Sequence, residues 1–289
     1  MKLYPGYLIC TLAVLLGDSL VAGSASMNPK EKLIITGTGS SIGTMQLMGE
    51  GFQKRHLKVT VNVLPSIGST GAIKAVKAGQ IDIGLSYHSL KPDERSTDII
   101  EEPYGRTPLI FGVQESNPTN GLTLEEIEDI YARKRKTWPD GTPIRLILRP
   151  ISDGLTVYLA GINPRLKSAS EQARSIPGVF IGMTDQEAAS QIEKTPGSLG
   201  TTSASLVASE KRKIKALSID GAIPALSNIA DGVHISAGKY PYTVTLSLVY
   251  RKDKYRGAVK DFIEFVFSKD GRKILSENGY VTLPRMTGK

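Results

Sequence analysis

The chain has 289 residues, of which 40% are apolar and 22% charged, and its formal net charge is +8. These values are typical of a globular protein, and at about 100–200 residues per domain the length allows two lobes or one large domain. Cys10 is the single cysteine, which excludes an internal disulfide and a cysteine-based zinc site, and the three histidines lack metal-ligand spacing. We therefore expect a folded protein without a cofactor.

The first 26 residues have the pattern of a secretory signal peptide. Tyr7–Leu16 is an apolar stretch of the length expected for the hydrophobic region, and small residues follow at Ala22–Ser26. Asp18 interrupts the apolar run well short of the about 20 residues that span a bilayer, which argues against a membrane anchor. We therefore predict a signal peptide over residues 1–26, cleaved near Ala25, and an exported mature protein.

Short apolar runs then alternate with amphipathic stretches along the chain. Capping boxes at Thr123–Glu126 and Thr184–Glu187 mark the starts of two helices. The patterns predict strands over 32–37, 58–64, 81–86, 107–114, 144–149 and 242–251, and helices over 43–55, 69–78, 124–132, 154–162, 185–195 and 259–267. This alternation indicates an α/β fold in which helices cover the faces of a parallel sheet.

One strand–turn–helix pattern occurs three times in the sequence: a predicted strand ends in a turn of glycine and hydroxyl residues, and a helix follows directly. The three turns are Thr36–Gly43, Pro65–Gly71 and Arg149–Thr156. Each turn places unpaired backbone N–H groups and the positive end of a helix dipole at the carboxyl edge of the sheet. Converging turns would bind a small oxyanion, and Arg149 would add a planar cation. The alternative interpretation is that the hydroxyl residues only cap helices.

Two motif-based alternatives begin in the first turn. Gly39–Gly43 fits the G-x-S-x-G elbow of serine hydrolases, with Ser41 as nucleophile and His234 as a formal base. That fold places several strands before the nucleophile, whereas this turn follows the first strand of the mature chain. The same turn is similar to a dinucleotide-binding loop, but the next strand, 58–64, ends without the carboxylate that would bind ribose. The sequence therefore favours oxyanion binding.

In order and spacing, these motifs resemble the periplasmic substrate-binding proteins of ABC importers, in particular phosphate-binding proteins. The resemblance extends from about Lys32 to Leu283, and the segments that carry it are 36–42 (TGTGSSI), 67–74 (IGSTGAIK), 79–86 (GQIDIGLS), 122–138, 196–200 (PGSLG) and 231–242. It implies the type II periplasmic-binding-protein fold. In that fold two Rossmann-like lobes, 27–107 with 243–289 and 108–242, are joined by two crossing strands and close on a ligand in the cleft.

The same resemblance implies what the protein does. It would be a non-enzymatic, monomeric protein of the periplasm that captures phosphate or a similar oxyanion for an ABC permease in the inner membrane, without a nucleic-acid partner. The residues expected to bind the ligand are Gly39, Ser40, Ser41, Ile42, Ser69, Thr70, Tyr87, Arg149, Ser152, Asp153, Gly154 and Thr156. The alternatives are a transport-independent sensor or adhesion module, and a secreted serine hydrolase with Ser41 as nucleophile.

Two departures from the family pattern concern the ligand. Tyr87 stands where the family has an aspartate that accepts a hydrogen bond from protonated phosphate, and the third turn is one residue longer, with serine and aspartate rearranged. Because phosphate keeps a proton at neutral pH, a site that selects it over sulfate needs a hydrogen-bond acceptor. We hypothesise that Asp153 is this acceptor. The alternative is that Asp153 only pairs with Arg149 and that Tyr87 donates to another oxyanion.

Overall fold

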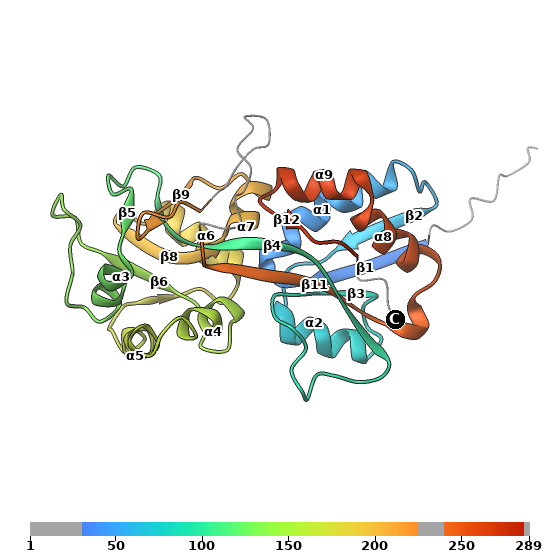
Figure 1. Ribbon diagram of the computed structural model, residues 1–289, viewed down its shortest axis with the longest axis horizontal. Coiled ribbons are helices and arrows are strands. Elements are labelled where there is room, and N and C mark those ends of the chain that lie inside the picture. Colours follow the sequence, from blue (N-terminus) through green and yellow to red (C-terminus); the bar gives the residue numbers. More distant parts are fainter. Residues whose placement is uncertain (1–30, 225–239, 286–289) are drawn as a thin grey trace, which may run out of the picture.

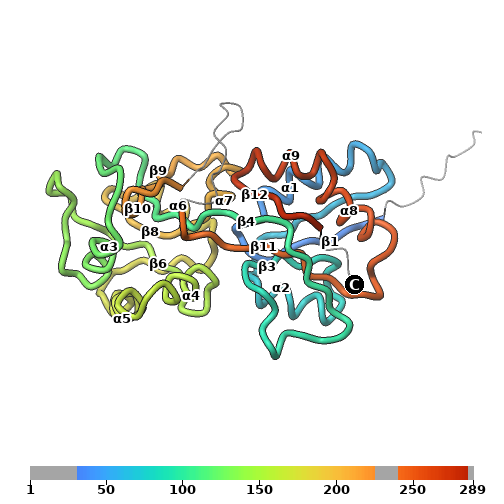
Figure 2. Tube along the Cα trace, in the orientation of Figure 1, coloured from blue at the N-terminus to red at the C-terminus, as the bar shows by residue number. Residues whose placement is uncertain are grey.

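The computed structural model describes residues 31–224 and 240–285 of the chain. The predicted signal peptide, His234 and part of the segment 231–242 lie outside these residues. Figure 1 shows an elongated molecule with a group of helices and strands at each end. Figure 2 shows that the first and last parts of the chain, blue and red, lie together in one of these halves. We call this the first half, and the other the second half.

The first half is built on three parallel strands, with β1 in the centre and β2 and β3 on either side. Helix α2 lies on one face of these strands, and α1, α8 and α9 pack together on the other (Figure 1). Buried apolar side chains such as Leu33, Met45 and Phe262 form the core between them. The elements of this half are β1 (Glu31–Gly37), α1 (Gly39–Gln53), β2 (Val59–Val63), α2 (Gly68–Lys77), β3 (Ile83–Ser86), α8 (Gly257–Phe267) and α9 (Lys269–Glu277).

The second half has the same kind of architecture. Strand β6 lies parallel to β8 on one side and to β7 on the other. Its elements are α3 (Leu124–Tyr131), β6 (Arg145–Leu148), α4 (Gly154–Ala160), α5 (Pro164–Ala173), β7 (Phe180–Ile181), α6 (Asp185–Lys194), β8 (Ser198–Ser203), α7 (Ala204–Ser209) and β9 (Ile214–Ala216). A separate two-stranded pair joins β5 (Gly121–Leu122) to β10 (Ser218–Ile219).

Two long antiparallel strands, β4 (Ile99–Gln114) and β11 (Thr243–Arg251), run between the halves (Figure 1). They pair with each other from Thr243 opposite Pro108 to Arg251 opposite Ile99, with an irregularity between Leu246 and Ser247. On the outer sides β11 pairs with β3 and β4 pairs with β8, so the strand order is β2-β1-β3-β11-β4-β8-β6-β7. One sheet therefore continues through both halves. Strand β9 and the short β12 (Val281–Thr282) also pair with β4.

The structure confirms the predicted α/β fold but moves some boundaries. Helix α1 begins at Gly39, four residues before the predicted start, because Thr38 is already extended and occupies the N-cap position. Most of the predicted first turn is therefore helix. The capping box at Thr123 is complete, whereas Thr184 accepts a hydrogen bond from the Glu187 N–H without the reciprocal bond. Within residues 31–224 and 240–285, no helix combines the length and apolar character of a membrane span.

Candidate functional site

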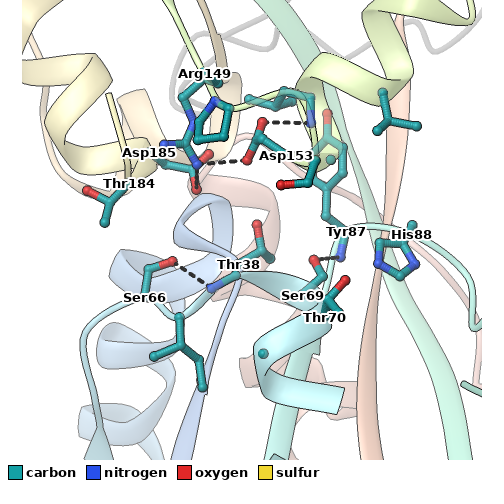
Figure 3. A pocket seen from close by; sticks show the side chains of 18 of the residues that line it. Thr38, Ser66, Ser69, Thr70, Tyr87, His88, Arg149, Asp153, Thr184 and Asp185 are labelled. Carbon is teal, nitrogen blue, oxygen red and sulfur yellow. Dashed lines mark hydrogen bonds and ion pairs between the residues drawn. The ribbon is translucent and has the colours of Figure 1, made fainter. Parts of the chain in front are cut away.

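A cavity of about 580 Å³ lies between the two halves, where several strands end. The segments that line it follow β1, precede α2, follow β3, follow β6 and precede α6. The second and third predicted turns therefore meet at one place, and the first turn contributes Thr38. Figure 3 shows Arg149, Asp153 and Asp185 gathered on one side of this cavity, facing Ser66 and Ser69 on the other. The cavity therefore has one wall from each half of the molecule.

The wall from the first half is the N-terminus of α2. The N-cap residue, Ile67, offers no capping side chain, and the Gly68 N–H donates weakly to the Ser66 hydroxyl at 3.4 Å. The first residues of the helix, Gly68–Gly71, line the cavity. Gly68 has φ +72°, a backbone conformation that favours glycine. Nothing lies within 4 Å of the position that a Cβ would take, so there is room for a ligand to approach the helix N-terminus. The Ser69 hydroxyl accepts a hydrogen bond from the Tyr87 N–H at 2.9 Å. The other N–H groups of the first helical turn and the helix dipole make this wall suited to an anion.

Arg149 supplies the cation of the opposite wall. Its side chain is only 5% exposed. Nη1 donates to the Gly182 carbonyl at 2.6 Å, and Nη2 donates to Asp153 at 2.7 Å and to Asp185 at 3.4 Å. The buried Nε has no partner among the described residues. Two carboxylates thus hold one guanidinium in place, and an N–H group of that guanidinium is left for a further acceptor.

Asp153 is committed to two structural contacts. One carboxylate oxygen accepts the N–H groups of Leu155 and Thr156 at 3.0 and 3.4 Å, which caps α4, and the other accepts Arg149. The ion pair with Arg149 that we considered as the alternative role of Asp153 is therefore present. Because each oxygen already has a donor, the carboxylate has less capacity for a proton on the ligand.

The Tyr87 side chain lines the cavity between the two walls. The side chain is 5% exposed, and its hydroxyl has no hydrogen-bond partner among the described residues. Burial raises the pKa of this phenol well above its usual value, and the negative charges of Asp153 and Asp185 raise it further. The hydroxyl therefore keeps its proton and can donate it. A Cβ at Gly154 would lie 2.7 Å from the Tyr87 ring, so glycine allows the two halves to meet here.

The structure separates the predicted site residues into two groups. Those that line the cavity are Ser69, Thr70, Tyr87, Arg149, Ser152, Asp153 and Gly154. Those that do not are Gly39, Ser40, Ser41, Ile42 and Thr156. Because α1 starts early, Ser40 and Ser41 turn into the interior, where the Ser41 hydroxyl bonds to that of Tyr104 at 2.8 Å. The Thr156 hydroxyl faces the Arg149 carbonyl oxygen at 3.5 Å, inside the protein.

Other residues that line the cavity lie outside the predicted set, among them Thr38, Ser66, His88, Lys91, Met183, Thr184 and Asp185. The signal for the last two was available, because the capping pattern at Thr184–Glu187 places polar residues at a helix start. By itself that pattern indicates only the start of a helix. The short strand β7 before it, with only two residues, gave no sign that this helix also begins at the carboxyl edge of the sheet.

Comparison with known proteins agrees with this architecture. Residues 22–270 match the family described as the PBP superfamily domain, and the chain belongs to this superfamily of periplasmic-binding-protein domains. The phosphate-binding protein PstS of Bacillus subtilis is 24% identical over 93% of this chain and 88% of its own length. The PstS protein of Pseudomonas aeruginosa is 22% identical over 86% of this chain and 84% of its own length.

Solved structures show the same fold. A substrate-binding protein of a putative phosphate ABC transporter from Clostridium perfringens, with bound phosphate, has a TM-score of 0.71 at 21% identity, covering 88% of this chain and all of the other. An ABC-type phosphate transport receptor from Vibrio cholerae has a TM-score of 0.59 at 20% identity over the same shares. The chain thus has the type II periplasmic-binding-protein fold. The relatives named above are phosphate-binding proteins rather than enzymes. The structure also argues against the hydrolase alternative, because the Ser41 hydroxyl that would act as nucleophile is buried against Tyr104.

Proposed function

We propose that this protein captures phosphate, or an oxyanion of similar size and charge, in the cavity between its halves and delivers it to an ABC permease. The observation that carries the proposal is that Arg149 lies opposite the N-terminus of α2. A tetrahedral oxyanion between them would accept helix N–H groups on one side and charge-assisted hydrogen bonds on the other. The phosphate-binding relatives support the same ligand.

The proposed site includes seven of the residues expected from sequence: Ser69, Thr70, Tyr87, Arg149, Ser152, Asp153 and Gly154. Donors from both halves would have to approach the ligand together, so capture would accompany closure of two lobes about β4 and β11. We keep the predicted lobe boundaries, 27–107 with 243–289 and 108–242, as part of this proposal. The net charge of +8 would favour the approach of anions. The proposal places the protein in the periplasm as a monomer after cleavage of residues 1–26.

The proposal is tested by titrating the purified protein with phosphate, sulfate, molybdate and methylphosphonate in a calorimeter. We expect one phosphate per chain, and a melting temperature that rises with the logarithm of the phosphate excess over the dissociation constant. Absence of binding to all four anions would contradict the proposal. Uptake of labelled phosphate is then compared between cells with and without the protein. Lower uptake without the protein would indicate delivery to a permease, and equal uptake would indicate sensing.

Replacing Tyr87 with phenylalanine is expected to weaken phosphate binding about tenfold, because the ligand loses one hydrogen bond to a charged group while the ring keeps its packing. Calorimetric dissociation constants measure the effect. Tyr240→Phe is the matched control. It removes a buried hydroxyl that donates to the Leu109 carbonyl at 2.8 Å, away from the cavity, and is expected to lower stability but leave the affinity unchanged. Equal affinities for Tyr87→Phe and the wild type would exclude Tyr87 from the site.

A further inference from the structure

The cavity between the halves is larger than a small inorganic anion needs. Its volume is about 580 Å³. If each of the five heavy atoms of phosphate took the about 30 Å³ that a water molecule occupies in the liquid, the anion would fill about 150 Å³. Most of the cavity would then lie outside the oxyanion. Protein cavities of this size commonly enclose organic ligands.

The size of the cavity does not come from widely separated halves, because the halves already touch around it. Gly39 of the first half donates its N–H to Asp185 of the second half at 3.1 Å, and its carbonyl accepts Gln186 Nε2 at 3.0 Å. Figure 3 shows Tyr87 extending from the first half toward the second. There a Cβ at Gly154 would lie 2.7 Å from the Tyr87 ring. The cavity therefore keeps this volume while the halves are in contact.

Carboxylates close two of the three helix starts that the sequence assigned to the oxyanion. Asp185 accepts the Gly39 N–H at the start of α1, and Asp153 accepts the Leu155 N–H at 3.0 Å at the start of α4. Among these three helices, α2 alone begins without a carboxylate cap. A buried ligand oxygen that finds no donor costs free energy. The site therefore suits a head group in which carbon replaces one of the four oxygen atoms.

Apolar side chains border the position of this head group. Ile67 directly precedes the first residue of α2, and Val157 lies on α4. Met183 directly follows Gly182, the residue whose carbonyl accepts Arg149 at 2.6 Å. Ile67, Val157 and Met183 all line the cavity, and their exposed fractions are 51%, 57% and 68%. Both halves thus present apolar surface next to the proposed anion position.

The same region holds most of the large apolar side chains that are exposed among the described residues. Leu64, Ile151 and Ile181 are also exposed, and each lies within two residues of one that lines the cavity. The other two, Leu57 and Ile223, lie elsewhere. Single exposed apolar residues are ordinary on a protein surface, whereas a group of them at a cavity marks a surface that binds an apolar group.

We propose that the ligand of this cavity is an organophosphonate whose apolar substituent lies against Ile67, Val157 and Met183. This inference rests on the proposed function, because the phosphonate head takes the place proposed there for the oxyanion, between Arg149 and α2. Inorganic phosphate has a similar head but no group that can contact the apolar residues. It therefore binds less tightly than the substituted compound.

The test is calorimetry with methyl-, ethyl- and propylphosphonate, which share one head group and differ in chain length. We expect the dissociation constant to fall about threefold to fourfold with each methylene group that is buried, and propylphosphonate to bind more tightly than inorganic phosphate. Propyl phosphate is measured beside butylphosphonate, which has the same number of chain atoms. The phosphonate of this pair is expected to bind more tightly than the ester.

The double variant Val157→Thr/Met183→Gln removes apolar surface from the cavity and keeps the approximate size of both side chains. Because both residues are exposed, the core is left intact. We expect the tightening from methyl- to propylphosphonate to fall from about tenfold to less than about twofold. The matched control, Leu57→Gln/Ile223→Thr, makes the same kind of change at exposed residues outside the cavity lining, and is expected to leave the tightening unaltered.

Each outcome decides the matter. Equal dissociation constants for the three phosphonates, with phosphate bound, would overturn the inference and leave the proposed function in place. An unchanged tightening in Val157→Thr/Met183→Gln would also overturn it, since the exposed apolar residues would then serve closure of the halves or contact with another protein. Tighter binding of propyl phosphate than of butylphosphonate would replace the phosphonate by an ester. Failure to bind phosphate and every phosphonate would refute the proposed function as well.

Discussion

Replacing Arg149 with methionine is expected to weaken phosphate binding at least about 100-fold and to lower the free energy of unfolding by about 3–5 kcal/mol. The guanidinium is buried, and its removal leaves the carboxylates of Asp153 and Asp185 in the protein interior without their cation. Methionine has a similar length but neither charge nor donors. Calorimetric titration measures the first effect, and urea denaturation at neutral pH measures the second.

Arg145→Met is the matched control for this experiment. Arg145 belongs to the same strand, β6, but it is exposed and donates to the Pro196 carbonyl away from the cavity. Its replacement is expected to change the stability by no more than about 0.5 kcal/mol and to leave phosphate binding unaltered. Phosphate affinity of wild-type strength in Arg149→Met would show that the anion does not bind opposite α2, and would refute the site proposed here.

Replacing Gly37 with alanine is expected to lower the free energy of unfolding by about 3 kcal/mol or more, or to prevent folding. Gly37 ends β1 with φ +156° and lies opposite Leu85 of β3. A Cβ here would overlap the Leu85 carbonyl oxygen and lie 2.6 Å from the Leu85 nitrogen, so strand pairing next to the first turn would have to break. Soluble yield and urea denaturation report the loss.

Gly79→Ala separates this steric effect from backbone strain. Gly79 also has a positive φ, +69°, but nothing lies within 4 Å of the position that its Cβ would take. We expect a cost of about 1 kcal/mol, from the left-handed conformation alone. Equal losses for the two variants would mean that the contact with Leu85 contributes nothing, and that the pairing of β1 with β3 tolerates a shift.

The fold could be predicted from sequence wherever hydrophobic periodicity was strong. Strands such as β1 and β11, and helix α8 with its apolar stripe, were found close to their bounds. Strand β8 was missed because its sequence, SLGTTS, is polar although every residue in it is buried. Helix α5 was missed because it carries few apolar residues and is stabilised by the Asn163 cap and by packing against α3. Both β8 and α5 are stabilised by tertiary contacts, which local sequence patterns do not reveal.

The candidate site was predicted in part for a similar reason. The glycine and hydroxyl turns at 65–71 and 149–156 carry their chemistry in local sequence, and both line the cavity. The first turn, 36–43, has the same composition, but most of it is the buried first turns of α1, and its N–H group at Gly39 is taken by Asp185. A contact between residues 146 positions apart leaves no trace in a single sequence. The sequence therefore located the two turns that line the cavity, but it did not reveal Asp185, the carboxylate that pairs with Arg149.

The pairing of β4 with β11 limits how the molecule can move. The two strands pair from Ile99 to Pro108, and the register shifts once, between Leu246 and Ser247. Breaking this ladder would leave backbone groups without partners, so rotation of one half against the other is restricted to torsion of an intact two-stranded ribbon. Torsion concentrates where pairing is already irregular. The amide protons of β4 and β11 should therefore exchange slowly with solvent whether or not the proposed ligand is bound.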